Sequence, residues 1–222
     1  QDTVVASRYD SCLTKIPLQD LSSFKEKIYE EVSDVPGKLI VKEYPTKTAS
    51  TQTIRNHLEK LRMRSIDVDM IIVDYGDLLR PVRYLKEKRN ELESIYEELR
   101  GIAAEYEAPV WTASQTNRSG LNAEVITMES ISEAFNKCFV ADFIFSISRT
   151  IEDKVANSGR LFVAKNRNGP DGLIFPLFMD TANVCIKVLE PSEENEIVEV
   201  SAKKQKENLV QKYQKFKKNN GG

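Results

Sequence analysis

Two cationic side chains stand at alternate positions just before a tight turn, in the segment LFVAKNRNGPDGLIF of residues 161–175. Apolar runs flank a Gly-Pro-x-Gly sequence, which is the pattern of two strands joined by a short loop. Because successive side chains of a strand point to opposite faces, Lys165 and Arg167 are expected on the same face. A hairpin needs the apolar residues and the glycines, but it does not need this pair. The pair is therefore a functional candidate, unless both residues are ordinary surface charges on an exposed hairpin.

Polar side chains also end two apolar runs earlier in the chain. Asp74 is the second-last residue of MIIVDY, and Ser114 and Gln115 are the last two residues of VWTASQ. Ligands of parallel α/β sheets bind at the carboxyl ends of the strands. Asp74 stands where a Walker B carboxylate would hold Mg²⁺ through water, and Gln115 can contact a γ-phosphate or the attacking water. The alternatives are an aspartate that caps the next element and a loop amide that forms a turn.

The glycine-rich phosphate-binding loop that accompanies a Walker B carboxylate in nucleotide hydrolases does not occur in the chain. The pattern G-x-x-x-x-G-K-[ST] is absent, and PGKL at residues 36–39 lacks the first glycine and the hydroxyl and precedes a predicted strand. Either the protein is no nucleotide hydrolase, or the loop lies upstream of Gln1. Because the chain begins in mid-pattern and without Met, we expect a fragment whose upstream part is missing.

Composition narrows the classes of function further. The 222 residues are 41% hydrophobic, and the net charge is −2, so any contact with nucleic acid must come from a local patch, concentrated by oligomerisation. Three scattered cysteines and the single His57 argue against a disulfide framework, a zinc site and Ser-His-Asp chemistry. No apolar run approaches the roughly 18 residues of a membrane span, and no signal peptide is visible, so we expect a cytosolic protein without membrane contact.

Apolar periodicity predicts alternating strands and helices, followed by strands alone. Helices are predicted over residues 17–33, 50–65, 90–108 and, as a short one, 128–137. Strands are predicted over residues 38–44, 69–75, 109–114, 142–148, 160–166, 173–178 and 184–190. This order predicts an α/β fold in which a parallel sheet flanked by helices is extended by antiparallel strands on its C-terminal side. We expect one domain over residues 1–190 and a charged tail over 191–222, disordered or helical only against a partner.

The motifs together resemble the RecA-like motor domain of DnaB-type hexameric replicative DNA helicases. MIIVDY, ASQTNR, ISEA, ADF and AKNRNGPDG occur in the order of that family. Two further stretches, GKLIVKEYPTKTAS and EELRGIAAEYEAPVWTASQ, are most similar to the T-even phage branch. The resemblance covers about residues 4–190, and K-x-R-N-G-P-x-G is its most specific part.

The resemblance implies a site that binds ATP and Mg²⁺. Asp74 would be the Walker B aspartate and the metal residue, and Gln115, beside Ser114, the γ-phosphate sensor. Lys165 and Arg167 would reach the ATP of the neighbouring subunit in a homo-hexamer, where arginine suits bidentate phosphate contact and lysine acts as a movable point charge. The Walker A loop and a catalytic glutamate would lie upstream, so this chain alone should not hydrolyse ATP.

The resemblance also implies partners. Single-stranded DNA would run through the channel of the ring, and a primase and a helicase loader are further partners that the family implies. A phage member would work in the cytoplasm of the bacterial host. The segment matching the DNA-contacting loops is MESISEAFNK (128–137), and a second candidate is the cation-rich RPVRYLKEKR (80–89), which is otherwise a solvated helix start. The candidate DNA contacts are Arg80, Arg83, Arg118, Ser132, Glu133, Ala134 and Lys137.

Two other functions remain open at this point. One is a different RecA-like ATPase, such as a recombinase that forms filaments on DNA. The other is a non-catalytic RecA-like module that only binds DNA or a partner.

Overall fold

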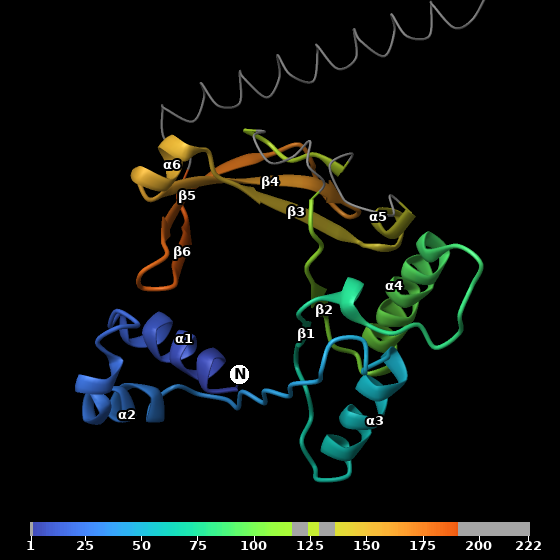
Figure 1. The fold of residues 1–222 in the computed structure, drawn as a ribbon, viewed down its shortest axis with the longest axis horizontal. Coiled ribbons are helices and arrows are strands. Elements are labelled where there is room, and N and C mark those ends of the chain that lie inside the picture. Colours follow the sequence, from blue (N-terminus) through green and yellow to red (C-terminus); the bar gives the residue numbers. More distant parts are fainter. Residues whose placement is uncertain (1, 117–123, 129–135, 191–222) are drawn as a thin grey trace, which may run out of the picture. The chain divides into compact units, whose positions relative to one another are not determined.

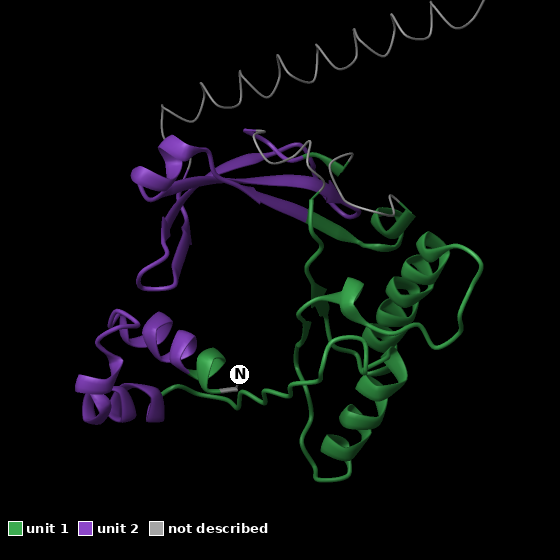
Figure 2. Ribbon diagram, viewed as in Figure 1, with its two compact units in different colours: residues 1–6, 35–121, 127–144 green, residues 7–34, 122–126, 145–222 purple. Residues whose placement is uncertain are grey.

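The computed structural model describes residues 2–116, 124–128 and 136–190. The predicted tail over 191–222 and four candidate DNA contacts, Arg118, Ser132, Glu133 and Ala134, lie outside these residues. The chain divides into two compact units, shown in Figure 2. Unit 1 comprises residues 1–6, 35–121 and 127–144, and unit 2 comprises residues 7–34, 122–126 and 145–222.

Unit 1 is built on two parallel strands, β1 (Ile71–Val73) and β2 (Val110–Thr112), with Val73 opposite Thr112. The remaining elements of this unit are α3 (Thr51–Arg62), the short 3₁₀ helix η2 (Gly76–Leu78), α4 (Lys88–Glu105) and α5 (Asn136–Val140). In Figure 1, α3 and α4 lie on the same side of the β1–β2 pair. Helix α3 begins where predicted, because Ser50 and Thr53 form a capping box that satisfies backbone donors of the first turn.

The core of unit 1 lies between these helices and the strand pair. Its buried residues are Leu58, Ile71, Ile95, Leu99, Ile102 and Ala108. Helix α4 supplies Ile95, Leu99 and Ile102, whose spacing of four and three residues places them on one face. That burial fixes α4 against the two strands, and so it also fixes the side chains that α4 presents to the strand ends.

Unit 2 contains a four-stranded sheet in the order β3-β4-β5-β6. These strands are β3 (Phe143–Ser148, which starts in unit 1), β4 (Ser158–Asn166), β5 (Ile174–Asp180) and β6 (Cys185–Val188). Strands β4 and β5 pair antiparallel, as do β5 and β6. The same unit holds most of α1 (Asp2–Thr14), the short 3₁₀ helix η1 (Leu21–Ser23), α2 (Lys25–Ser33) and α6 (Ile151–Val155).

A buried carboxylate fixes the start of β4. Asp153 in α6 accepts hydrogen bonds from the Thr150 amide at 2.7 Å, the Ser158 hydroxyl at 3.0 Å and the Arg160 guanidinium at 2.6 Å. Burial by itself would raise the pKa of Asp153, but the hydrogen bonds from Thr150, Ser158 and Arg160 outweigh it and lower the pKa to about 2. The carboxylate is therefore ionised at neutral pH.

The predicted α/β fold is confirmed, with differences in particular elements. Parallel and antiparallel strands are both present, but among the described residues they form two separate sheets. Residues 38–44 are not the predicted strand: they have no regular structure, and Leu39, Ile40 and Val41 are exposed. Their composition favours a strand, yet nothing in the described part of the chain pairs with them. Helices α1 and α6 were not predicted, and the predicted helix over 17–33 is interrupted between η1 and α2.

Two further observations concern the described residues as a whole. No helix in that part of the chain is both long enough and apolar enough to cross a lipid bilayer. All three cysteines are free thiols, with Cys138 and Cys185 buried and Cys12 partly exposed.

Candidate functional site

The carboxyl ends of β1 and β2 meet at one edge of the parallel pair. The pairing of Val73 with Thr112 means that Asp74 follows one strand and Ala113 follows the other at the same level. Asp74, Ser114 and Gln115 are all exposed at this edge. The structure therefore brings together the candidates that the sequence placed at two separate strand ends.

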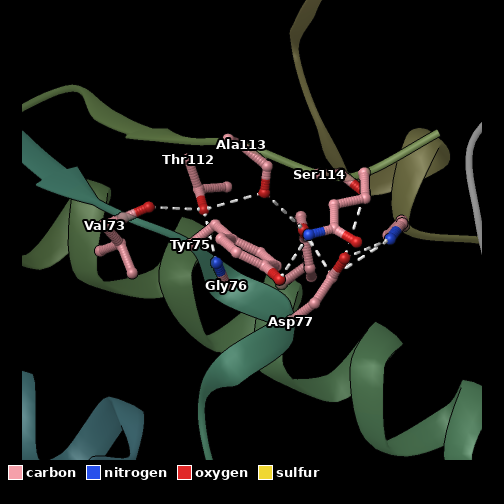
Figure 3. Close-up of polar contacts among 10 residues, drawn as sticks. Val73, Tyr75, Gly76, Asp77, Thr112, Ala113 and Ser114 are labelled. Carbon is pink, nitrogen blue, oxygen red and sulfur yellow. Dashed lines mark hydrogen bonds and ion pairs between the residues drawn. The ribbon is translucent and has the colours of Figure 1, made fainter. Parts of the chain in front are cut away.

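A threonine hydroxyl joins the two strand ends directly. Thr112 Oγ1 donates a hydrogen bond to the Val73 carbonyl at 2.9 Å and accepts one from the Gly76 amide at 2.8 Å (Figure 3). A Cβ atom at Gly76 would lie 3.2 Å from Thr112 Oγ1 and 3.3 Å from the Tyr96 ring, so any other residue in the turn after β1 would crowd both groups. The peptide bond between Asp74 and Tyr75 within this turn is cis.

Beside this edge lies a set of polar side chains that we call the Asp77 cluster: Asp77, Tyr96, Ser114 and Lys137. The Tyr96 hydroxyl donates to Asp77 Oδ1 at 2.9 Å, and the Ser114 hydroxyl donates to Oδ2 at 3.2 Å. Lys137 Nζ lies 3.1 Å from Oδ1 and 3.0 Å from Oδ2. The cluster therefore joins the turn after β1, the loop after β2, α4 and α5.

The charges of this cluster are largely removed from solvent. The Lys137 side chain is 2% exposed and that of Asp77 is 17% exposed. Lys137 Nζ also lies 5.6 Å from the centre of the Tyr96 ring, in the range of a cation–π contact. Burial, and then the negative charge of Asp77, raise the pKa of Tyr96, so its hydroxyl stays protonated and remains a donor.

Gln115 is held by a different partner at the same edge. Its Nε2 donates to the Tyr75 hydroxyl at 2.8 Å, while the Tyr96 hydroxyl lies 3.4 Å from the Ala113 carbonyl. The loop after β2 is thus tied to the turn after β1 both at Ser114 and at Gln115. The amide of Gln115 is exposed and can exchange its contact with Tyr75 for one with a bound phosphate.

The donor set at this edge fits Mg²⁺ held mainly by other ligands. Among the described residues, no group of three or more His, Cys, Asp or Glu side chains could enclose a metal ion. Mg²⁺ in phosphate sites keeps several waters and uses only one or two carboxylates together with phosphate oxygens. Asp74 is exposed and can serve in that way, whereas Asp77 is already engaged by Tyr96, Ser114 and Lys137.

Lys165 and Arg167 belong to unit 2, on and after β4. Lys165 is half-buried near the end of the strand, and Arg167 is exposed in the turn that follows. The direction of Arg167 is therefore set by the turn and not by strand alternation. Asn166 shapes that turn: its Nδ2 donates to the Pro170 carbonyl at 3.2 Å, and its Oδ1 accepts from the Asn168 amide at 3.3 Å.

The remaining candidates within the described residues differ in exposure. Arg80 and Arg83 are exposed in the irregular segment between η2 and α4, where the Arg80 amide donates to the Ala49 carbonyl at 2.8 Å. Lys137, in contrast, is buried against Asp77. A contact between Lys137 and DNA stays a prediction, and it requires this ion pair to open.

Sequence reasoning missed the roles of Asp77 and Tyr96. Asp77 follows Asp74 by three residues in VDYGDLL, and a second acid so close to a strand end was the signal available. The sequence gives no indication of a role for Tyr96, because an aromatic residue is common at such a position on a helix.

Comparison with known proteins identifies a family. The family described as DnaB-like helicase C terminal domain matches residues 5–184. The DnaB-like replicative helicase of Enterobacteria phage T4 is 30% identical over 181 residues, which cover 76% of this chain and 38% of the phage protein. The replicative DNA helicase DnaB of Mycoplasma genitalium is 24% identical over 181 residues, covering 74% of this chain and 38% of that protein.

Solved structures show the same fold. One of them, described as an ATPase domain, superposes with a TM-score of 0.71 at 18% identity, covering 86% of this chain and 72% of that one. A DnaB-like replicative helicase, from a structure described with its interactions with primase, gives a TM-score of 0.68 at 19% identity, covering 83% of this chain and 48% of that one. The predicted RecA-like fold is thereby confirmed.

The matches cover most of this chain but only part of each curated relative. The chain spans 38% of the length of each of the two curated helicases. The matched region, residues 5–184, includes β1, β2, the Asp77 cluster and the β4–β5 hairpin. The chain belongs to the family of DnaB-like helicase C-terminal domains.

Proposed function

We propose that this chain forms part of the motor domain of a replicative DNA helicase, which couples ATP hydrolysis to translocation along single-stranded DNA and to duplex unwinding. The observation that supports this most is the register of β1 and β2, which brings Asp74 and Gln115 to one edge. The same edge in a chain of the DnaB-like family is where we expect the subunit's own nucleotide.

Each residue at this edge has a definite task in the proposal. ATP is the substrate, whose γ-phosphoryl group passes to water while ADP leaves, and a bound Mg²⁺ would supply positive charge that stabilises the phosphate oxygens during this transfer. Asp74 would hold Mg²⁺ through one of the waters bound to the metal. Gln115 leaves Tyr75 and donates its amide hydrogen to the γ-phosphate or orients the attacking water. Ser114 lines the same nucleotide site.

The cationic pair acts on a different nucleotide. In a homo-hexameric ring, Lys165 and Arg167 reach the ATP of the neighbouring subunit and neutralise charge that develops on its γ-phosphate. The exposure of Arg167 in a turn shaped by Asn166 supports this role, since the guanidinium must cross an interface.

DNA and protein partners complete the proposal. DNA phosphates would contact Arg80, Arg83, Arg118 and the segment 128–137 with Ser132, Glu133, Ala134 and Lys137. A primase and a loader are proposed partners, and the proposed compartment is the cytoplasm of a phage-infected bacterium. The P-loop and the catalytic glutamate are proposed to lie upstream, so the chain of 222 residues alone should show no turnover.

The test is ATP hydrolysis by the protein extended upstream to include the P-loop, with and without single-stranded DNA. We expect DNA to stimulate turnover, and Asp74→Asn to lower kcat by about 10²–10³-fold, as loss of a transition-state contact does. Asp69→Asn, which changes an exposed acid before the same strand, is the matched control and should keep wild-type turnover.

The alternatives give different results in that experiment. A recombinase-like ATPase would form filaments on DNA instead of rings in electron micrographs. A binding module would show no hydrolysis, and its reading frame would contain no P-loop. An Asp74→Asn variant as active as Asp69→Asn would contradict the assignment of this edge.

A further inference from the structure

A buried ion pair, Lys137–Asp77, stands next to the proposed nucleotide edge. The roles above involve Lys137 only as a DNA contact after the pair has opened, and they give the closed pair no task. Lys137 is almost completely buried, and both of its contacts with Asp77 are within the range of charge-assisted hydrogen bonds. Buried ion pairs contribute little net stability compared with apolar residues of the same size. The pair therefore requires an explanation other than stability.

The contacts of Asp77 lead toward Gln115. Asp77 Oδ2 accepts from the Ser114 hydroxyl at 3.2 Å, and Ser114 immediately precedes Gln115. Tyr96, which donates to Asp77 Oδ1, also lies 3.4 Å from the Ala113 carbonyl. The residues just before Gln115 are thus held by groups that Asp77 arranges.

Lys137 determines where Asp77 can be. Its ammonium group lies between the two carboxylate oxygens, at 3.1 and 3.0 Å, and so fixes the carboxylate in the orientation that Tyr96 and Ser114 need. Without this cation, the Asp77 side chain loses its charged partner in a site with little solvent, and it is expected to turn toward water. Ser114 then loses its acceptor, and the loop after β2 gains freedom.

We propose that Lys137 and Asp77 are positioning residues: through Ser114 and Tyr96 they hold the backbone just before Gln115, from which its side chain reaches the nucleotide once it leaves Tyr75. The inference rests on the proposed function and adds a second layer to the same site. Hydrolysis thereby depends on a lysine that touches neither nucleotide nor DNA while the pair is closed. Because Lys137 lies in α5 and Asp77 in η2, a shift of α5 is passed to the Gln115 loop by this pair.

The test is a double-mutant cycle in the upstream-extended protein. Lys137→Met keeps the length of the side chain and removes its charge, and we expect it to lower kcat by about 10–100-fold, as small misplacements of catalytic groups do. The KM for ATP should change little, because nucleotide contacts remain. In a Gln115→Ala background, Lys137→Met should lower kcat by less than about 3-fold, since residues acting through one group are non-additive.

Two further variants keep the test decisive. Tyr96→Phe removes only one hydroxyl from the cluster and preserves the ring, so it can replace Lys137→Met if that variant does not fold. We expect it to lower kcat by about 3–10-fold, and to have no effect on kcat in the Gln115→Ala background. Lys60→Met changes an exposed lysine on α3 in the same unit and should leave kcat unchanged.

The outcomes separate this inference from the proposed function. If Gln115→Ala leaves DNA-stimulated hydrolysis intact, the assignment of Gln115 itself is wrong. If Gln115→Ala lowers kcat but Lys137→Met and Tyr96→Phe lower it by the same factor in both backgrounds, the positioning role is overturned. A folded Lys137→Met variant with wild-type kcat overturns it as well.

Discussion

Two basic side chains of this molecule occupy opposite environments. In unit 1, Lys137 is 2% exposed and is fixed by Asp77 beside the ends of the parallel strands. In unit 2, Arg167 is exposed in the turn after β4, and Asn166 shapes that turn through hydrogen bonds to its backbone. The difference fits the two uses of positive charge that we propose: Lys137 would hold neighbouring groups in place within the subunit, and Arg167 would reach the nucleotide of a neighbouring subunit.

The largest expected effect concerns the outward-reaching cation. Arg167→Ala in the upstream-extended protein should lower DNA-stimulated ATP turnover by about 10³–10⁵-fold, the range for arginine fingers. Nucleotide binding should persist, because the subunit's own site is untouched. Steady-state hydrolysis and equilibrium binding of a fluorescent ATP analogue measure the two quantities.

Mixing subunits sharpens this prediction. Subunits with Arg167→Ala should regain part of their activity when mixed with Asp74→Asn subunits, because each kind supplies what the other lacks at some interfaces. Lys187→Ala, an exposed cation on β6 of the same sheet, is the control and should behave like the wild type. Absence of any recovery, with rings intact, would argue that Arg167 acts within its own subunit.

The second prediction compares the stability contributed by two lysines. Lys137→Met should lower the free energy of unfolding by about 2–4 kcal/mol, because Asp77 loses its ion-pair partner in a site with little solvent and the cluster must rearrange. Lys165→Met should cost less than about 1 kcal/mol, as partly exposed charges do. Urea denaturation followed by far-UV circular dichroism measures both. Equal losses would remove the contrast between the two units.

Two glycines offer the third comparison, since they are required for different reasons. Gly76 is needed for space, because an added Cβ would lie 3.2 Å from Thr112 Oγ1, whereas Gly172 has nothing within 4 Å but a φ of +78°. Alanine should cost about 1–3 kcal/mol at Gly76 and about 1–2 kcal/mol at Gly172.

Comparing asparagine with alanine should give opposite results at these two glycines. It tolerates positive φ, so Gly172→Asn should be milder than Gly172→Ala, whereas Gly76→Asn should be worse than Gly76→Ala because it is larger. Thermal unfolding of the four variants tests this. The same order at both sites would contradict the separate explanations.

The smallest expected effect concerns pH and the carboxylate that anchors β4. The pKa of Asp153 is lowered to about 2 from an ordinary value of 3.8, so its ionised form stabilises the fold above about pH 4. This contribution, about 1–2 kcal/mol after allowance for partial solvent screening, is lost as the pH falls toward 2. Unfolding of wild type and Asp153→Asn should therefore differ at pH 5 and converge near pH 2. A constant difference would contradict the assigned cause.

Sequence patterns predicted those elements whose signal is local. The apolar runs that lead to Asp74 and to Ser114 are strands with aligned ends. Helix α3 follows from its capping residues and its periodicity, and α4 from its periodicity. The prediction for residues 38–44 was wrong because strand formation depends on a partner strand, which composition does not reveal. Lys165 and Arg167 were predicted to share one strand face, although the predicted strand itself ended at residue 166. Because β4 does end at Asn166, the turn and not strand alternation sets the direction of Arg167.

The Asp77 cluster could not have been predicted from local patterns. Its members come from four elements and are separated in sequence by 19 residues between Asp77 and Tyr96 and by 60 between Asp77 and Lys137. Only the packing of α4 and α5 against the strand ends brings them together. From the sequence alone, Lys137 is indistinguishable from an exposed lysine, because its burial depends on the tertiary structure.

The burial of Cys138 next to Lys137 has a practical consequence. Cys138 is 3% exposed, so we expect its thiol to react with a thiol reagent only when α5 opens. Under such conditions the modification rate is the intrinsic rate multiplied by the fraction of molecules in which that helix is open. Cys185 is also buried, in the other unit, and Cys12 is partly exposed, so each thiol can be followed separately by peptide mass spectrometry. The modification rate of Cys138 thus reports local opening at the Asp77 cluster in the native protein, without an introduced label.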